Sequence, residues 1–446
     1  MDLTLLYWTR TQFMVSVGFL AFFLAISLGL AWMLLFFRWR AQRTAQVAWL
    51  SAYRFWVRVF ALSFVLAVCA ALIVLFQLGG LWGGLMDRIG NVAGPLLGYA
   101  VISLFIFKSC FLGIMLFGQR RVSERMHVFA VAMVAVGQTV AVSWVVVLQA
   151  WLATPTGARL FENRFQVYDW TAVVLNPALG WHLASVVVGS ALAVGCLILG
   201  LTANQARRRK LEEGERLAFQ SALVLTVLAA LLHIPVAAWA IDAAVKHQPA
   251  KAAAMAGFWE TGPSPAIVVL GWPKASEERN VAAWSWRNAG GALLARNAQG
   301  EYLGLDSFSG MRPPMPLTFL TWRAVALLWL AVLVLAVITL LRVRKRQFDP
   351  AVLSGPTLQM LSACMVIGAL LATLRTWAEF MGLSPYVVQG LVTQAEVLGP
   401  MHASSVMWGT FGYLTLYALL AAAFFAMVFH AARYGVVPVR RVGRVG

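Results

Sequence analysis

Nine long apolar runs divide this chain, and they constrain its fold more than any other feature. They lie near residues 13–36, 56–78, 95–117, 128–151, 182–203, 217–240, 318–341, 355–378 and 403–429. A helix needs about 20 mainly apolar residues to cross the hydrocarbon core of a bilayer. The runs therefore predict an all-α integral membrane protein with about nine transmembrane helices.

The composition supports this fold class. Of the 446 residues, 61% are hydrophobic and only 12% are charged, whereas soluble globular chains carry about 25% charged residues. The start, MDLTLLYWTRTQF, has no basic segment followed by a small-residue cleavage site, so we expect the first span to be retained. We find no internal repeat, and we predict one membrane domain over residues 1–446.

The formal net charge of +18 comes from basic residues that cluster in alternate loops. The clusters are Arg38, Arg40 and Arg43; Arg120, Arg121 and Arg125; Arg207, Arg208, Arg209 and Lys210; Arg342, Arg344, Lys345 and Arg346; and Arg433, Arg440, Arg441 and Arg444. This positive-inside pattern predicts an N-terminus outside and a cytoplasmic C-terminus. An anionic inner leaflet accounts for such clusters, so no nucleic-acid partner is expected.

The segment 241–316 breaks the hydrophobic rhythm, since it carries charges of both signs and several prolines. The alternation of loops places it outside, between the sixth and seventh spans. Within it, two short apolar stretches flank Asn297–Gly300, which predicts a small hairpin over 291–305.

The apolar runs also contain cysteines and one lysine that need an explanation. Cys69, Cys110, Cys196 and Cys364 show no CxxC or Cys/His spacing, so we expect buried thiols rather than disulfides or zinc ligands. Lys108 lies near the middle of the third run. An ionisable residue inside a span marks a functional site by default. We expect its ammonium to pair with a carboxylate or carbonyls of a neighbouring chain, or to reach partly toward the membrane boundary.

Several short motifs occur in a particular order along the chain. They are Arg10-Thr-Gln-Phe13, Gly94-Pro-Leu-Leu-Gly-Tyr99, Phe111-Leu-Gly-Ile-Met-Leu-Phe-Gly118, Trp151-Leu-Ala-Thr-Pro-Thr-Gly157, Asn176-Pro177 and the stretch from Gln248 to Thr261. With nine spans and a long loop after the sixth, the chain resembles the large subunit (subunit I) of the cytochrome bd quinol oxidases.

The resemblance implies a multi-pass subunit of a bacterial-type inner membrane. Members of that family oxidise quinol at the outer loop and pass electrons through haem b and haem d to oxygen. Such chemistry needs imidazole or thioether ligands for the irons and buried carboxylates that carry protons.

The family's haem-ligand positions are substituted in this chain. The first-span histidine, ten residues after Arg10, is Leu20; the fifth-span histidine, eight residues after Asn-Pro, is Ser185; and the seventh-span methionine, two residues after Arg323, is Val325. His182, one turn before Ser185, is a weak candidate for a metal ligand and otherwise an interfacial histidine. From these substitutions we predict no haem in this chain.

The family's carboxylates are substituted as well. Two glutamates of the third span correspond to Ala100 and Lys108, and a loop glutamate corresponds to Ala256. The retained residues are Lys251, Trp259, Glu260 and Arg323, which we take as quinol-binding candidates, and Trp377 and Glu379. The alternative is that Lys251 and Glu260 are solvated loop residues and that Trp259 anchors at the membrane interface.

Three functions fit these residues. In the first, the chain is a haem-depleted homologue that acts as a structural or quinone-related subunit of a bd-type complex, with lipid around it and a bd-type small subunit or a ligand-complete large subunit as partner. In the second, it is a catalytic subunit I with altered haem ligation. In the third, it reuses the scaffold for transport, to which Lys108 alone points.

Overall fold

The structure, a computed structural model, describes residues 3–286 and 288–434. Within these residues nine helices are long and apolar enough to cross a membrane, which confirms the predicted fold class. They are α1 (Leu3–Thr44), α2 (Val47–Gly80), α3 (Gly83–Phe117), α4 (Glu124–Ala153), α6 (Leu179–Ala206), α7 (Glu213–His247), α9 (Met315–Val343), α10 (Gly355–Leu383) and α11 (Ala403–Tyr434). Three arginines of the last basic cluster, Arg440, Arg441 and Arg444, lie outside the described residues.

The helices are longer than the apolar runs that predicted them. The 42 residues of α1 rise about 63 Å at 1.5 Å per residue, roughly twice the hydrocarbon thickness of a bilayer. The sequence had placed Arg38, Arg40 and Arg43 in a loop. Because α1 continues to Thr44, they lie instead on its last turns. Helix α1 is thus longer than a crossing of the hydrocarbon core requires.

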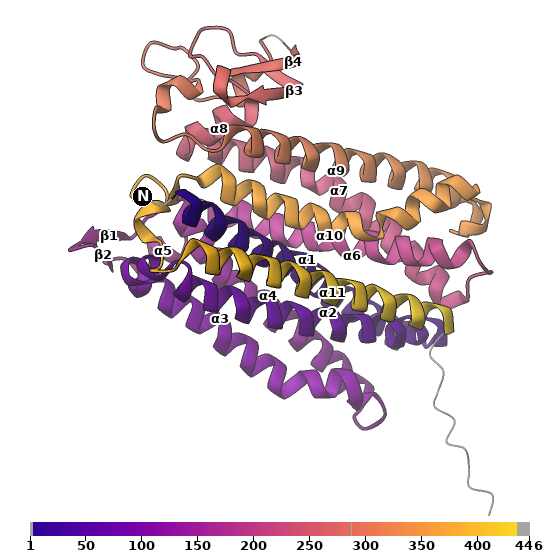
Figure 1. The fold of residues 1–446 in the computed structure, drawn as a ribbon. Helices are drawn as coiled ribbons and strands as arrows, with labels where there is room; N and C mark the ends of the chain where they lie inside the picture. Colours follow the sequence, from indigo (N-terminus) through magenta and orange to yellow (C-terminus); the bar gives the residue numbers. More distant parts are fainter. Residues whose placement is uncertain (1–2, 287, 435–446) are drawn as a thin grey trace, which may run out of the picture.

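The nine helices run side by side as one elongated bundle (Figure 1). Helix α1 lies inside it and contacts α2, α4, α6, α10 and α11. Glycines allow the closest approaches: a Cβ on Gly29 of α1 would meet the Ser190 carbonyl oxygen of α6 at 2.3 Å, and a Cβ on Gly368 of α10 would meet the Leu192 carbonyl oxygen at 2.7 Å. At these glycines the backbones of α1 and α10 therefore come close to the backbone of α6.

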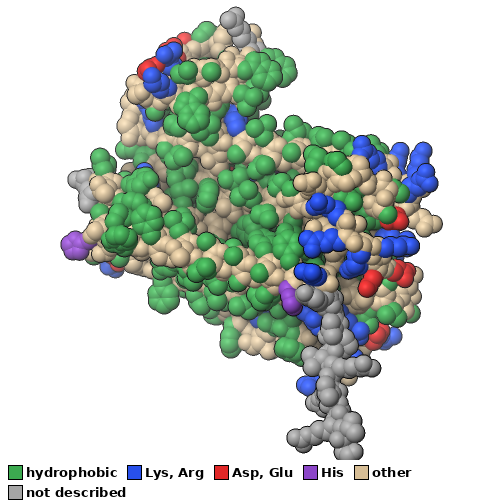
Figure 2. Space-filling view, turned by 45° about the vertical axis from the view of Figure 1, so that its right-hand side comes forward, with side chains coloured by type: hydrophobic (Ala, Val, Ile, Leu, Met, Phe, Trp, Pro, Cys, Tyr) green, Lys and Arg blue, Asp and Glu red, His purple; other side chains and the backbone are tan. Residues whose placement is uncertain are grey.

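The two ends of the bundle differ in their charge. The N-terminus and the end of α11 lie at opposite ends (Figure 1), as an odd number of spans requires. Lysine and arginine side chains gather at the end opposite the N-terminus (Figure 2), which we call the basic end; the other is the N-terminal end. Which end faces the cytoplasm stays a prediction from the positive-inside rule.

Short elements gather at the N-terminal end. They include the hairpin of β1 (Ala158–Phe161) and β2 (Arg164–Val167), helix α5 (Trp170–Val174), helix α8 (Pro249–Ala256), and the paired strands β5 (Tyr386–Val388) and β6 (Val392–Thr393). A cluster of buried apolar residues, with Trp82, Trp151 and Phe165 among them, joins several of these elements to α3 and α4.

The long loop begins later than the sequence had indicated. Helix α7 continues to His247 and α8 follows at once, so the irregular part starts at Gly257. It contains a hairpin of β3 (Ile267–Lys274) and β4 (Arg279–Trp286), which the sequence analysis missed. The predicted hairpin over 291–305 is reduced to a single bridge between Arg296 and Tyr302, with Asn297–Gly300 in its turn.

The cysteines follow the prediction only in part. Cys196 and Cys364 are buried, whereas Cys69 and Cys110 are exposed on the outside of the bundle. The prediction of four buried thiols is therefore wrong for α2 and α3, because an apolar run does not tell which helix face points to lipid.

Candidate functional site

A buried ion pair marks the centre of the candidate site. Lys251 of α8 donates from Nζ to Glu379 Oε2 of α10, and the two side chains are 3% and 8% exposed. Gly382 makes room for this contact, since a Cβ there would lie 2.8 Å from the Lys251 Cγ and Cδ atoms. The interpretation of Lys251 as a solvated loop residue is therefore wrong.

Aromatic and basic groups of α6 and α10 surround this pair. The Lys251 ammonium lies 5.9 Å from the Trp181 ring centroid, and the Arg375 guanidinium carbon lies 5.8 Å from it. The His182 ring packs on Trp181 with centroids 3.5 Å apart. Two cations, one carboxylate and one imidazole thus meet at the N-terminal end. With the imidazole neutral, the formal charge of this cluster is about +1.

Two polar atoms of this cluster lack a hydrogen-bond partner in the described part of the chain. They are Glu379 Oε1 and Trp181 Nε1. Buried polar atoms are nearly always satisfied by protein or ordered water, so this cluster has room in its hydrogen-bonding for a further polar group. The sequence analysis missed Trp181 and Arg375 as site residues; the signal available was only their position at helix ends near His182 and Glu379.

Arg323 of α9 lies outside this cluster and binds backbone carbonyl groups. Its Nε and both terminal nitrogens donate to the carbonyl oxygens of Val269 at 3.2 Å, Met255 at 2.5 Å and Val268 at 2.5 Å. Its guanidinium carbon also lies 4.1 Å from the Phe319 ring centroid. Arg323 therefore fastens α8 and β3 to α9.

The other two quinol-binding candidates face still other partners. Trp259 donates from Nε1 to Asn280 Oδ1 at 3.2 Å, which links the start of the loop to β4. Glu260 is exposed on the surface. Lys251, Trp259 and Arg323 thus have separate contacts, and Glu260 is exposed, so the four candidates do not converge on one ligand position.

The three positions that the resemblance assigns to haem ligands carry no haem-ligating side chain. Ser185 and Val325 are 3% and 6% exposed, and Leu20 is half-buried. Val325 packs in an apolar cluster with Val188, Leu192 and Cys364. A haem iron takes imidazole, thioether or thiolate ligands, so hydrocarbon and hydroxyl side chains at these positions do not fit one.

His182 is the imidazole nearest to Ser185 along the helix, and it is buried within the protein near the start of α6. It is 2% exposed, lies on the first turn of α6, and its Nδ1 lies 2.8 Å from the Ala178 carbonyl oxygen. Its charged neighbours are Glu379, Arg375 and Lys251. Among the described residues, no group of three or more His, Cys, Asp and Glu side chains is arranged to hold a metal.

Lys108 has its partners within this chain. Its Nζ donates to Gln138 Oε1 at 3.1 Å, and Gln138 Nε2 donates to Ser27 Oγ at 2.7 Å. The ammonium also lies 4.2 Å from the Phe64 ring centroid and 5.0 Å from that of Phe60. These contacts lie within the chain, and pairing with a neighbouring chain stays a prediction. Side chains of α1, α2, α3 and α4 enclose the lysine.

The other two positions that the resemblance assigns to carboxylates, Ala100 and Ala256, are buried. Ala100 of α3 is 8% exposed and Ala256 of α8 is 1% exposed. Ala256 belongs to the small core beneath the loop, with Val268, Leu294 and Phe319. Neither methyl group can carry a proton.

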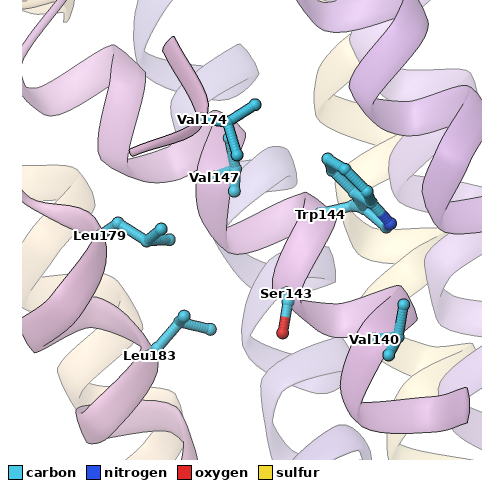
Figure 3. Close-up of a pocket in the computed structure, with 7 residues that line it drawn as sticks. All are labelled: Val140, Ser143, Trp144, Val147, Val174, Leu179 and Leu183. Atoms are coloured by element: carbon cyan, nitrogen blue, oxygen red, sulfur yellow. The ribbon is translucent and has the colours of Figure 1, made fainter. Parts of the chain in front are cut away.

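An apolar hollow of about 220 Å³ lies between α4, α5 and α6. Figure 3 shows Leu179 and Leu183 facing the α4 residues across it. Its one hydroxyl, Ser143 Oγ, donates to the Thr139 carbonyl oxygen at 2.8 Å. The hollow has the lining of a lipid-facing groove and offers no group for catalysis.

These observations can be set beside known proteins. A family model described as cytochrome bd terminal oxidase subunit I matches residues 8–436. The chain belongs to this family. It is a multi-pass membrane protein of that family, and the predicted resemblance is confirmed.

Individual relatives agree with the family. The chain is 23% identical over 427 residues to a cytochrome bd ubiquinol oxidase subunit 1 of Bacillus subtilis, with 93% of this chain and 90% of that protein covered. It is 26% identical over 278 residues to the cytochrome bd-II ubiquinol oxidase subunit 1 of Escherichia coli, with 62% of this chain covered. That match spans about half, 54%, of the E. coli protein.

A solved structure has the same fold. The bd oxidase from Geobacillus thermodenitrificans matches with a TM-score of 0.87 and 19% identity, and the match covers 97% of this chain and 99% of that one. The fold has therefore been kept at low sequence identity.

Proposed function

We propose that this chain is a haem-depleted subunit I homologue that serves as a structural or quinone-related membrane subunit of a bd-type complex. The observation that carries the proposal is the joint substitution of the three ligand positions by Leu20, Ser185 and Val325. An unligated haem would keep only its packing contacts in an apolar site. Apolar side chains at Leu20 and Val325 fill space that a cofactor would otherwise need.

The environment of Lys108 supports the same proposal. At this position a relative with a glutamate has a group that can take up and release protons within the membrane. Here the ammonium is held by Gln138, Phe60 and Phe64, all of which are uncharged. The site has the opposite charge and no carboxylate, so proton transfer by a carboxylate is lost.

The proposed setting is a bacterial-type inner membrane, with the basic end in the cytoplasm. The proposed partner is a bd-type small subunit or a ligand-complete large subunit, which would supply the haems. Quinone could still bind at the N-terminal end, where Glu379 Oε1 and Trp181 Nε1 have no partner within the described residues.

Isolation of the intact complex from native membranes tests this proposal. A tagged chain, solubilised in mild detergent, is expected to co-purify with a second bd-type subunit, and the haem spectrum is expected to follow the partner. Recovery of the chain alone, with haem bound to it, would instead favour a catalytic subunit with altered ligation. Recovery alone without haem, together with solute flux in vesicles, would favour transport.

A further inference from the structure

The β3–β4 hairpin presents bulky apolar side chains to the outside of the molecule. Trp272, Trp284 and Trp286 are 63%, 66% and 70% exposed, and Leu270, which pairs with Trp284, is 45% exposed. The opposite side of β3 is buried through Val268 and Pro273. The hairpin thus has one face toward the protein and one apolar face that is not covered by any of the described residues.

Its contacts place the hairpin beside the membrane-spanning helix α9. The carbonyls of Val268 and Val269, at the base of the hairpin, accept hydrogen bonds from Arg323. Arg323 lies eight residues, or about 12 Å of helix rise, after the start of α9. Figure 1 shows the hairpin alongside α8 and the first part of α9. The base of the hairpin therefore lies level with the end of the span.

The opposite end of the hairpin is polar and lies farther out. Its turn carries Lys274, Glu277, Glu278 and Arg279, in which Glu277 pairs with both Lys274 and Arg279. Glu278 pairs at 2.5 Å with Arg312, which precedes α9. The hairpin therefore runs from an apolar base level with the span to a charged turn near the loop that precedes it.

The neighbouring helix α9 also carries exposed apolar side chains. That helix exposes Leu317, Leu327 and Leu330, and Figure 2 shows hydrophobic side chains both on the loop and on the bundle below it. Tryptophan is enriched at membrane–water interfaces, because its ring has an apolar body and a polar N–H group. Trp284 and Trp286 lie near the base of the hairpin and Trp272 lies nearer the turn, and exposed tryptophans along such a hairpin fit lipid headgroups and the upper acyl chains.

We propose that the β3–β4 hairpin is an interfacial anchor that places Trp272, Trp284 and Trp286 in the headgroup region of the adjacent leaflet. Through Arg323 and α8, the bilayer then fixes the position of the loop above the Lys251–Glu379 pair. This proposal is independent of haem content, because no residue of the ligand positions takes part in it.

Spin labelling of the full chain in phosphatidylcholine–phosphatidylglycerol vesicles tests the anchor. A nitroxide is attached at Trp284→Cys in a Cys69→Ala/Cys110→Ala background, since the other two cysteines are buried. The matched control carries the label at Ser276→Cys, in the exposed turn of the same hairpin. Power saturation measures collision with oxygen, which partitions into lipid, and with a water-soluble nickel chelate.

The ratio of oxygen to nickel collisions is expected to be several-fold higher at position 284 than at position 276. Equal ratios at the two positions would overturn the proposal, because the tryptophan face would then be in water. The label at position 284 could instead be shielded from both reagents, and only in samples in which a second protein co-purifies. That result would also overturn the proposal and would assign this face to a protein partner.

Discussion

Lys251 of α8 and Glu379 of α10, 128 residues apart, form an ion pair that is almost completely buried. The contact joins the short helix that starts the long loop to a central spanning helix. Two charges removed from water have to satisfy each other, because neither can regain its lost hydration. The pair is therefore a structural link at the N-terminal end of the bundle, whether or not quinone binds next to it.

Substitution of Lys251 by methionine is expected to destabilise the protein strongly. The change removes the hydrogen-bonded partner of the buried Glu379 carboxylate and leaves only the charge of Arg375 near it; breaking comparable buried pairs costs about 3–5 kcal/mol. The double variant K251M/E379L removes both members of the pair and is expected to recover part of that loss, because Arg375 then loses its nearby carboxylate. Thermal unfolding in one detergent measures both; a double variant as unstable as K251M would contradict the ion-pair account.

Lys108 provides a second charge test. Lys108→Leu keeps an apolar contact with Phe60 and Phe64, whereas Lys108→Glu directs a carboxylate at two ring faces that carry negative potential. We expect a lower melting temperature and less assembled complex for K108E than for K108L. Native gel analysis and thermal unfolding measure the two variants. Assembly that is unchanged by both substitutions would show that the charge at this position has no role.

Arg323 should control the order of the long loop. Its three hydrogen bonds to backbone carbonyls disappear in Arg323→Met, and we expect faster proteolysis within residues 257–314 while the spans remain folded. Arg323→Lys restores the charge with fewer donors in a fixed plane, so its cleavage rate should lie between the two. Cleavage of R323M at the wild-type rate would contradict the assigned role.

Acid should loosen the same loop through Asp306. Burial acts against ionisation of this carboxylate, but hydrogen bonds from Thr261 and Ser307 outweigh it and lower the pKa of Asp306 below its usual value. Its contribution to stability is therefore present above the unfolded-state pKa of about 4 and is lost as the pH falls through the lower folded-state value.

Hydrogen–deuterium exchange of residues 257–314 measures this dependence, after correction for the intrinsic exchange rate at each pH. Wild-type protection is expected to fall below about pH 4, whereas D306N should show lower protection at neutral pH and little further change on acidification. A wild-type profile that matches that of D306N at every pH would contradict the role of the ionised carboxylate.

The spans were predictable because the bilayer imposes a length and an apolar composition on each of them. Their ends were not, because hydropathy shows where an apolar run stops, whereas the helix continues beyond it through polar residues such as Arg43. The β3–β4 hairpin was missed because Gly271 and Pro273 interrupt the apolar pattern of β3. Its register is also irregular at Leu270 and Trp272.

The candidate site was predictable only as separate residues. Lys251 and Glu379 were both retained in the resemblance, yet no local period relates residues 128 positions apart, so their pairing came only from the fold. Lys108 was recognised as unusual because it interrupts an apolar run. Its partner Gln138 was hidden, because a glutamine in another span carries no charge that marks it.

Haem content per chain tests the central proposal most directly. The chain is purified without partners from membranes of a haem-replete host, and pyridine haemochromogen absorption is compared with protein concentration, with His182→Ala as the matched control. We predict far less than one haem per chain in both proteins. A stoichiometric b-type spectrum in the wild-type chain would contradict haem depletion, and its loss in H182A would identify His182 as the ligand.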